Sequence, residues 1–205
     1  MADPAPSPTA TSAQTLSVPR FWNVPNSLSV ARMALSVVVF ALIGVERYLF
    51  AAAVFGVAAL TDALDGYLAR LLDQVTPIGR QLDPLVDKVI VAGAYIYLLT
   101  IPGTGLMPWM VTTIVIRELL IQGLRSHLEG QGQAFGAKTA GKIKTTLQCL
   151  SISAILLCLA AEPARGWLVA RDVLTWLAVF MTLYSGLGYL VSAFPAMKGR
   201  GGRVD

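Results

Sequence analysis

Two acidic motifs decide how this chain folds: Asp62-Ala-Leu-Asp65-Gly66-Tyr-Leu-Ala69-Arg70 and, after eight intervening residues, Gly79-Arg-Gln-Leu-Asp83-Pro-Leu-Val-Asp87. A long apolar run, residues 48–60, precedes the first motif, and another, residues 89–99, follows the second. An aspartate at the centre of a bilayer costs about 2.5–3.5 kcal/mol on an insertion scale. Carboxylates flanked in this way therefore need a compensating partner.

The spacing within the motifs indicates what that partner is. On an α-helix Asp62 and Asp65 (i, i+3) share one face, and so do Asp83 and Asp87 (i, i+4). Four carboxylates from two consecutive helices can converge on one spot, where they repel one another unless a cation lies between them. Oxygen ligands without a nearby His or Cys suit a hard divalent ion such as Mg²⁺, Mn²⁺ or Ca²⁺.

Small residues and one arginine complete the pattern. Gly66 and Ala69 fall close to the helical stripe of Asp62, and Gly79 lies one turn before Asp83, so a large ligand can approach both helices. Arg70 adds a fixed positive charge of the kind that a phosphate needs. The motifs predict a combined phosphate and metal site. The alternative, solvated loop acids between two membrane helices, does not account for the helical spacing together with the small residues.

Composition places this site in a membrane protein. The chain has 205 residues, of which 55% are hydrophobic and 14% charged, and its mean hydropathy is +0.64. These values are too apolar for a soluble domain of this length. They predict an all-α polytopic membrane protein, and the net charge of +4 is explained by membrane topology rather than by nucleic-acid binding.

Six apolar segments predict six transmembrane helices, each near or above the ~20 residues that a span requires. They cover about 27–44, 47–71, 82–101, 107–127, 142–161 and 168–193. We expect a disordered tail at 1–17, a membrane domain at 18–197 and a short basic tail at 198–205. Residues 18–24, which contain Arg20 and Trp22, are expected to form a short interfacial helix.

The distribution of basic residues predicts the orientation. Of the 16 Lys and Arg residues, only Arg47, Arg165 and Arg171 fall on the side opposite the N-terminus. By the positive-inside rule, both termini and the acidic motifs face the cytoplasm.

Further basic groups suggest an anion site on the same side. Arg117 and Glu118 can pair within the fourth apolar segment, and Arg125 lies eight residues after Arg117. Lys142 and Lys144 open the fifth segment, where backbone N–H groups of a helix N-terminus favour anions. The alternative is charge that only sets the topology.

The acidic motifs resemble the signature of the CDP-alcohol phosphotransferase family, Asp-x-x-Asp-Gly-x-x-Ala-Arg-x(8)-Gly-x-x-x-Asp-x-x-x-Asp, and match every fixed position. The elements Arg-Glu, Gly-Leu-Arg and Gly-Lys-x-Lys-Thr-x-x-Gln look like the bacterial branch that makes phosphatidylglycerophosphate. The similarity runs from about Pro25 to the end of the sixth segment. The opening Pro-Asn-x-Leu-Ser-x-x-Arg is also similar, with Ser29 where Thr is common.

The resemblance implies transfer of a phosphatidyl group from CDP-diacylglycerol to the 1-hydroxyl of sn-glycerol 3-phosphate, with release of CMP. Asp62, Asp65 and Asp83 would hold one or two Mg²⁺ or Mn²⁺ ions, and Asp87, also near the metal, would be the general base. The expected nucleotide-binding residues are Asn26, Ser29, Asp62, Gly66, Ala69, Arg70 and Gly79. The expected acceptor phosphate-binding residues are Arg117, Arg125, Lys142, Lys144 and Thr145.

The resemblance also implies a homodimer among the lipids of a bacterial inner membrane. Within the same chemistry the acceptor could instead be inositol phosphate, serine or a lipid alcohol. A different class, a cation transporter, could also place carboxylates within the membrane. Transporters usually show repeated halves, and residues 107–193 contain no second cluster of aspartates.

Overall fold

The computed structural model describes the backbone of residues 24–72, 77–130, 139–161 and 163–198, and the side chains of 30–61, 88–128, 130, 140–161 and 163–192. Within these residues it contains six α-helices and no strand. The helices are α1 (Val24–Gly44), α2 (Tyr48–Leu72), α3 (Pro77–Leu99), α4 (Pro108–Gly130), α5 (Thr139–Ala160) and α6 (Arg165–Lys198). The predicted all-helical fold is confirmed, whereas the predicted helix at 18–24 lies almost wholly outside the described residues.

Helix boundaries extend beyond the apolar segments. α3 begins at Pro77 rather than near residue 82, and α6 continues to Lys198. Hydropathy marks only the part of a helix that is apolar, whereas the helix itself continues through polar residues such as Arg80 and Gln81. Pro77 and Pro108 each open a helix, which is the position where the missing N–H of proline costs least.

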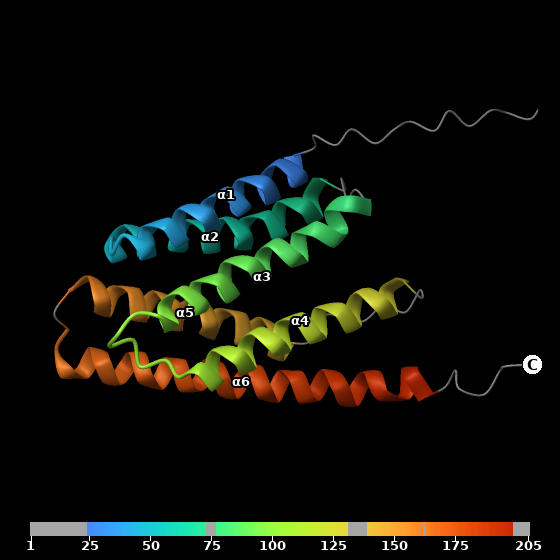
Figure 1. Cartoon of the computed structure of the whole chain (residues 1–205). Helices are drawn as coiled ribbons and strands as arrows, with labels where there is room; N and C mark the ends of the chain where they lie inside the picture. The colour runs from blue at the N-terminus through green and yellow to red at the C-terminus, as the bar shows by residue number, and fades with distance from the viewer. Residues whose placement is uncertain (1–23, 73–76, 131–138, 162, 199–205) are drawn as a thin grey trace, which may run out of the picture.

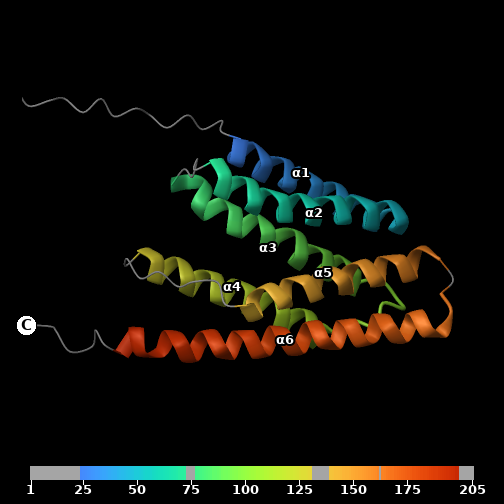
Figure 2. The same ribbon diagram turned by 180° about the vertical axis from the view of Figure 1, so that it is seen from behind.

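The helices run alternately in opposite directions between two ends of the molecule (Figure 1). α1 packs on both α2 and α3, while α4 and α5 both pack on α6. Contacts of α2 with α5, and of α3 with α4 and α5, join these two groups. Figure 2 shows the same two groups from behind. The end of α2, the beginnings of α1 and α3 and the ends of α4 and α6 share one end of the molecule.

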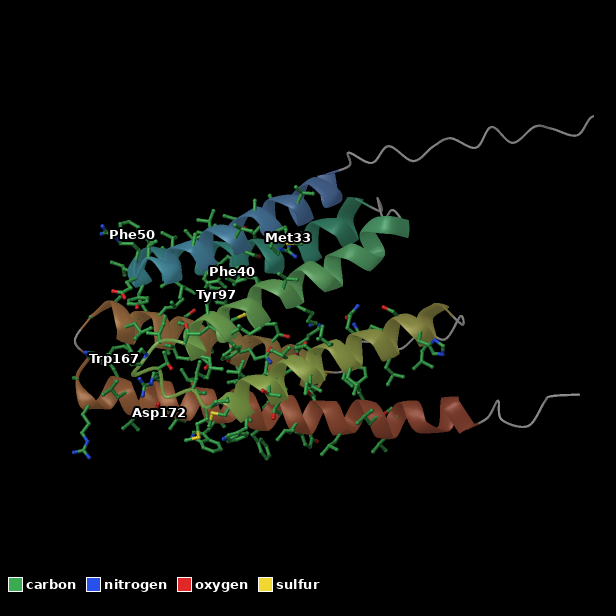
Figure 3. The ribbon with its side chains drawn as sticks, in the orientation of Figure 1. Met33, Phe40, Phe50, Tyr97, Trp167 and Asp172 are labelled. Atoms are coloured by element: carbon green, nitrogen blue, oxygen red, sulfur yellow. The ribbon has the colours of Figure 1, made fainter. Side chains whose placement is uncertain are left out.

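An apolar core runs between the two groups of helices. Phe55 of α2, Tyr95 of α3 and Ile114 of α4 are at most 1% exposed. Phe40 of α1 stacks on Tyr97 of α3 with ring centroids 5.2 Å apart (Figure 3). A Cβ at Gly93 would collide with the Phe40 ring, so the glycine is what lets α1 and α3 approach.

The distribution of polarity is that of a membrane protein. The interior holds charged and polar side chains, among them Glu118 and Lys144, each 2% exposed, while Phe180 and Val191 are 63% and 73% exposed. Such broad apolar surfaces are rare on soluble monomers. The stretches Ala140–Ala160 and Arg165–Ser192 are long and apolar enough to cross a membrane. Shorter apolar stretches cover Val30–Gly44, Tyr48–Thr61 and Lys88–Leu99.

The loop between α3 and α4 is fastened to α6 at the opposite end from the acidic motifs. Arg171 donates from Nη1 to the carbonyl of Gly103 at 2.5 Å and from Nη2 to Asp172 Oδ1 at 2.7 Å. Gly103 and Gly105 have φ of 82° and 75°, and a Cβ at Gly105 would lie 2.8 Å from Asp172 Oδ1. The loop needs glycine at these positions.

Candidate active site

The acidic motifs lie on two helices that meet at one end of the molecule. Asp62 and Asp65 belong to the last turns of α2, and Asp83 and Asp87 to the first half of α3. Only residues 73–76 connect the two helices, so these segments are neighbours in space (Figure 1). The helical spacing predicted for each pair is confirmed at the level of the backbone. The side chains of Asn26, Ser29, Asp62, Asp65, Gly66, Ala69, Arg70, Gly79, Asp83 and Asp87 lie outside the described residues, and their roles stay predictions.

A cavity of about 400 Å³ adjoins the acidic motifs. Its lining includes Leu60, two residues before Asp62, and Lys88, the residue after Asp87. Five helices contribute to it, and most of its wall is apolar. The lining residues are Arg32, Phe55, Ala58, Ala59, Leu60, Lys88, Ile90, Val91, Glu118, Thr145, Thr146, Gln148 and Cys149. The combination of an apolar wall with a few polar groups is typical of a ligand site.

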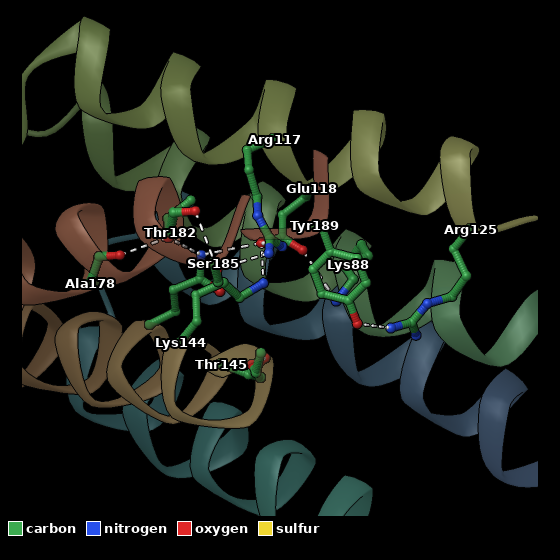
Figure 4. A network of polar contacts seen from close by, with 12 residues as sticks. Lys88, Arg117, Glu118, Arg125, Lys144, Thr145, Ala178, Thr182, Ser185 and Tyr189 are labelled. Atoms are coloured by element: carbon green, nitrogen blue, oxygen red, sulfur yellow. Dashed lines mark hydrogen bonds and ion pairs between the residues drawn. The ribbon is translucent and has the colours of Figure 1, made fainter. Parts of the chain in front are cut away.

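Glu118 is the centre of a charged cluster at the cavity wall (Figure 4). Its Oε1 accepts hydrogen bonds from Lys144 Nζ, from Arg117 Nη1 at 3.4 Å and from Gln148 Nε2 at 3.4 Å. Its Oε2 lies 3.1 Å from Lys88 Nζ. Because the carboxylate is almost completely buried, the surrounding cations are what make its charge tolerable there.

Three helices supply the cations around this single carboxylate. Lys88 comes from α3, Arg117 from α4 and Lys144 from α5. Since three positive groups surround one negative group, the cluster retains an excess of positive charge. Lys88 also joins the cluster directly to the second acidic motif, because it follows Asp87 in the chain.

α6 supplies uncharged hydroxyl groups as hydrogen-bond acceptors for polar side chains of α4 and α5. Ser185 Oγ accepts a hydrogen bond from Arg117 Nη2 at 2.8 Å, and Tyr189 OH accepts one from Arg125 Nη2 at 2.5 Å. Thr182 Oγ1 accepts from Gln148 Nε2 at 3.1 Å. In Figure 4, Tyr189 lies between Arg117 and Arg125.

The structure brings two of the five predicted acceptor-site residues together on one carboxylate. Arg117 and Lys144 meet at Glu118, and Arg125 lies two turns further along α4 toward the end that carries the acidic motifs. Thr145 lines the cavity, although its hydroxyl donates to the carbonyl of Gly141 at 3.1 Å. Lys142 is exposed.

Several residues of this cluster were not predicted from the sequence. Glu118 is predicted only as a partner of Arg117, Gln148 appears only as the last residue of a short motif, and Lys88 counts only among the basic residues that set the orientation. Ser185 and Tyr189 carry no signal of their own in an apolar helix. A buried carboxylate in an apolar run could have indicated that several cations surround it.

The residues of the acidic motifs fit a divalent cation by their chemistry. They provide four carboxylates, two from the last turns of α2 and two from the first half of α3, and the oxygen donor set suits a hard ion. Among the side chains that the structure describes, no three His, Cys, Asp or Glu come together. Because they supply four carboxylates, the motif aspartates are the candidates to hold a divalent ion.

Comparison with known proteins identifies the family of the chain. The family model for CDP-alcohol phosphatidyltransferase matches residues 22–184. A protein of Bacillus subtilis (strain 168) named CDP-diacylglycerol–glycerol-3-phosphate 3-phosphatidyltransferase is 37% identical over 194 residues, which cover 86% of this chain and 98% of the relative. A protein of the same name from Pseudomonas fluorescens is 36% identical over 183 residues, covering 86% of this chain and 92% of the relative. The chain belongs to the CDP-alcohol phosphatidyltransferase family.

Proposed function

We propose that this chain is the enzyme that transfers a phosphatidyl group from CDP-diacylglycerol to sn-glycerol 3-phosphate, giving phosphatidylglycerophosphate and CMP. The observation that carries this function is the position of the cavity. Its lining residues Leu60 and Lys88 adjoin the family's acidic motifs in the chain, and Glu118, the centre of the cluster of excess positive charge, lies on its wall. The relatives' names specify the same two substrates.

The acidic motifs are proposed to bind the nucleotide half of the donor. Asp62, Asp65 and Asp83 would hold one or two divalent cations, Mg²⁺ or Mn²⁺. A bound divalent ion offsets the charge of a diphosphate and stabilises the leaving CMP. Gly66, Ala69 and Gly79 leave room for the nucleotide, Arg70 binds its phosphate, and Asn26 and Ser29 approach it from α1.

Asp87 is proposed to remove the proton from the acceptor's 1-hydroxyl. The oxygen then attacks the phosphorus of the phosphatidyl group, the bond to the CMP oxygen breaks, and CMP leaves. Placing the base on the helix next to the donor's phosphate allows direct in-line attack without a covalent enzyme intermediate.

The basic cluster is proposed to bind the acceptor's phosphate. Arg117, Arg125, Lys142, Lys144 and Thr145 are the candidates, and Lys88 joins them on the evidence of its contact with Glu118. Glycerol 3-phosphate carries close to two negative charges at neutral pH, which the excess positive charge matches. Serine, as a rival acceptor, carries no phosphate and would not need this excess positive charge.

The helices are proposed to cross the membrane six times, as one domain of residues 18–197. Because the acidic motifs and the described ends of the chain share one end of the molecule, and because most basic residues fall there, this end would face the cytoplasm of a bacterial inner membrane. The family resemblance favours a homodimer.

Release of CMP by the purified protein tests the function. In detergent with CDP-diacylglycerol and Mg²⁺, we expect CMP to appear only when glycerol 3-phosphate is added, and to stop on chelation of the metal. Inositol phosphate, serine and phosphatidylglycerol serve as rival acceptors. Faster CMP release with any rival acceptor would overturn the assigned acceptor, and no CMP release with glycerol 3-phosphate or with any rival would overturn the reaction.

A further inference from the structure

α6 contributes to the basic cluster without contributing charge. Between Asp172 and Lys198 the helix has no charged residue, yet Thr182, Ser185 and Tyr189 are all buried and share the face turned toward α4 and α5 (Figure 4). Their spacing of three and four residues places them along one stripe of the helix. Each of them accepts a hydrogen bond from a polar side chain of α4 or α5.

Ser185 holds Arg117 in a defined orientation. Its hydroxyl donates to the carbonyl of Thr182 at 3.2 Å, which leaves its lone pairs for Arg117 Nη2 at 2.8 Å. The adjacent Gly186 lets the stem of Arg117 lie close to α6, since a Cβ there would be 3.1 Å from Arg117 Cγ. The position of Arg117 is thus set by α6 at two points.

Tyr189 holds Arg125 by two contacts. Its hydroxyl accepts from Arg125 Nη2 at 2.5 Å, and Cζ of Arg125 lies 5.6 Å from the centroid of the Tyr189 ring. The tyrosine is 6% exposed, so its own position is fixed by packing.

We infer that Ser185 and Tyr189 are positioning residues, which hold Arg117 and Arg125 ready to receive the phosphate of the acceptor. This inference rests on the proposed function of the two arginines. Arg117 donates one N–H to Ser185 and one to Glu118, and Arg125 donates one to Tyr189, so each guanidinium, with its five N–H donors, keeps donors for a phosphate. A hydroxyl fixes the arginine without adding a further negative charge to the cluster. Fixing the side chain beforehand lowers the entropy lost on binding.

Two variants, each lacking one hydroxyl, test the inference in the full-length enzyme: Ser185→Ala and Tyr189→Phe. The matched controls are Ser151→Ala, another buried serine, and Tyr184→Phe, an exposed tyrosine of the same helix. We expect each test variant to raise the KM for glycerol 3-phosphate about tenfold, the effect of losing one hydrogen bond to a charged group. The KM for CDP-diacylglycerol and the midpoint of thermal unfolding should match those of the controls. Ser185→Thr, which keeps the hydroxyl, should show the wild-type KM for glycerol 3-phosphate.

A double-mutant cycle separates this inference from the proposed function. Arg125→Ala should raise the KM for glycerol 3-phosphate, and Tyr189→Phe should add nothing in that background. If the arginine variant raises this KM but the hydroxyl variants behave as their controls, the inference is wrong and the acceptor site stands. If neither kind of variant raises it, both are wrong. An equal rise in the KM of both substrates, or a lower unfolding midpoint, would show a structural role and overturn the inference.

Discussion

The ion pair between Glu118 of α4 and Lys144 of α5 is almost completely removed from water, with side chains 1% and 2% exposed. The same carboxylate also meets Lys88 of α3 at 3.1 Å and Arg117 at 3.4 Å. Three neighbouring helices are therefore tied together through one acidic group at the wall of the cavity. The arrangement combines a structural contact with a source of positive charge for the site.

Loss of Glu118 should destabilise the protein more than loss of Lys144. Glu118→Gln leaves three cations without their counter-charge, and we expect it to lower the free energy of unfolding by about 3–5 kcal/mol. Lys144→Gln leaves Glu118 with Lys88 and Arg117, so a smaller loss of about 1–3 kcal/mol is expected. Thermal unfolding of both variants in the same detergent measures the difference. A reversed order would mean that Glu118 is not the centre of the cluster.

Gly186 should matter for the acceptor, and Gly188 should not. A Cβ at Gly186 would press on the stem of Arg117 at 3.1 Å, whereas a Cβ at Gly188 would meet nothing within 4 Å. Gly186→Ala is therefore expected to displace the guanidinium and to raise the KM for glycerol 3-phosphate severalfold, since a misplaced binding group loses its productive geometry. Gly188→Ala is the matched control on the same helix, and equal effects of the two substitutions on this KM would contradict the account.

Asp87→Asn should remove turnover while leaving the donor bound. A general base contributes about 10²–10⁴-fold to the rate, so kcat is expected to fall by at least about 10²-fold. Binding of CDP-diacylglycerol, measured by displacement with CDP, should change little. Asp172→Asn is a suitable control, because that carboxylate contacts Arg171 near the beginning of α6, at the end of the molecule opposite the acidic motifs. Near-normal turnover by the Asp87 variant would show that another group takes the proton.

The helices and the acidic motifs could be predicted from the sequence because each leaves a local signal. Apolar runs of membrane length indicate the helices, and the spacing of Asp62 and Asp65 indicates a shared helical face. The predicted beginning of α3 lies about five residues after the observed one, Pro77. Hydropathy marks only the apolar part of the helix, and the first residues of α3 are helical but polar.

The basic cluster could be predicted only in part, because its contacts join residues far apart in the chain. Arg117 and Glu118 are neighbours in sequence, and their pairing was expected. The partners of Arg117 and Arg125 on α6 are 68 and 64 residues away. A serine or tyrosine in an apolar helix shows no sign of such a partner until the helices are packed.

Reporter fusions should show that the end bearing the acidic motifs faces the cytoplasm. Green fluorescent protein fused after Asp205 is expected to fluoresce, because it folds in the cytoplasm, and alkaline phosphatase at the same point should be inactive. Alkaline phosphatase fused after Thr104, in the loop between α3 and α4, should be active. The opposite pattern would contradict the orientation that the basic residues predict.

Binding of Mn²⁺ shows whether acids from α2 and α3 share one ion. Electron paramagnetic resonance of the purified protein with CDP-diacylglycerol would measure free and bound Mn²⁺. We expect Asp65→Asn on α2 and Asp83→Asn on α3 each to weaken Mn²⁺ binding at least about tenfold, because each removes one charged ligand from the shared site. Wild-type affinity in either variant would contradict this expectation.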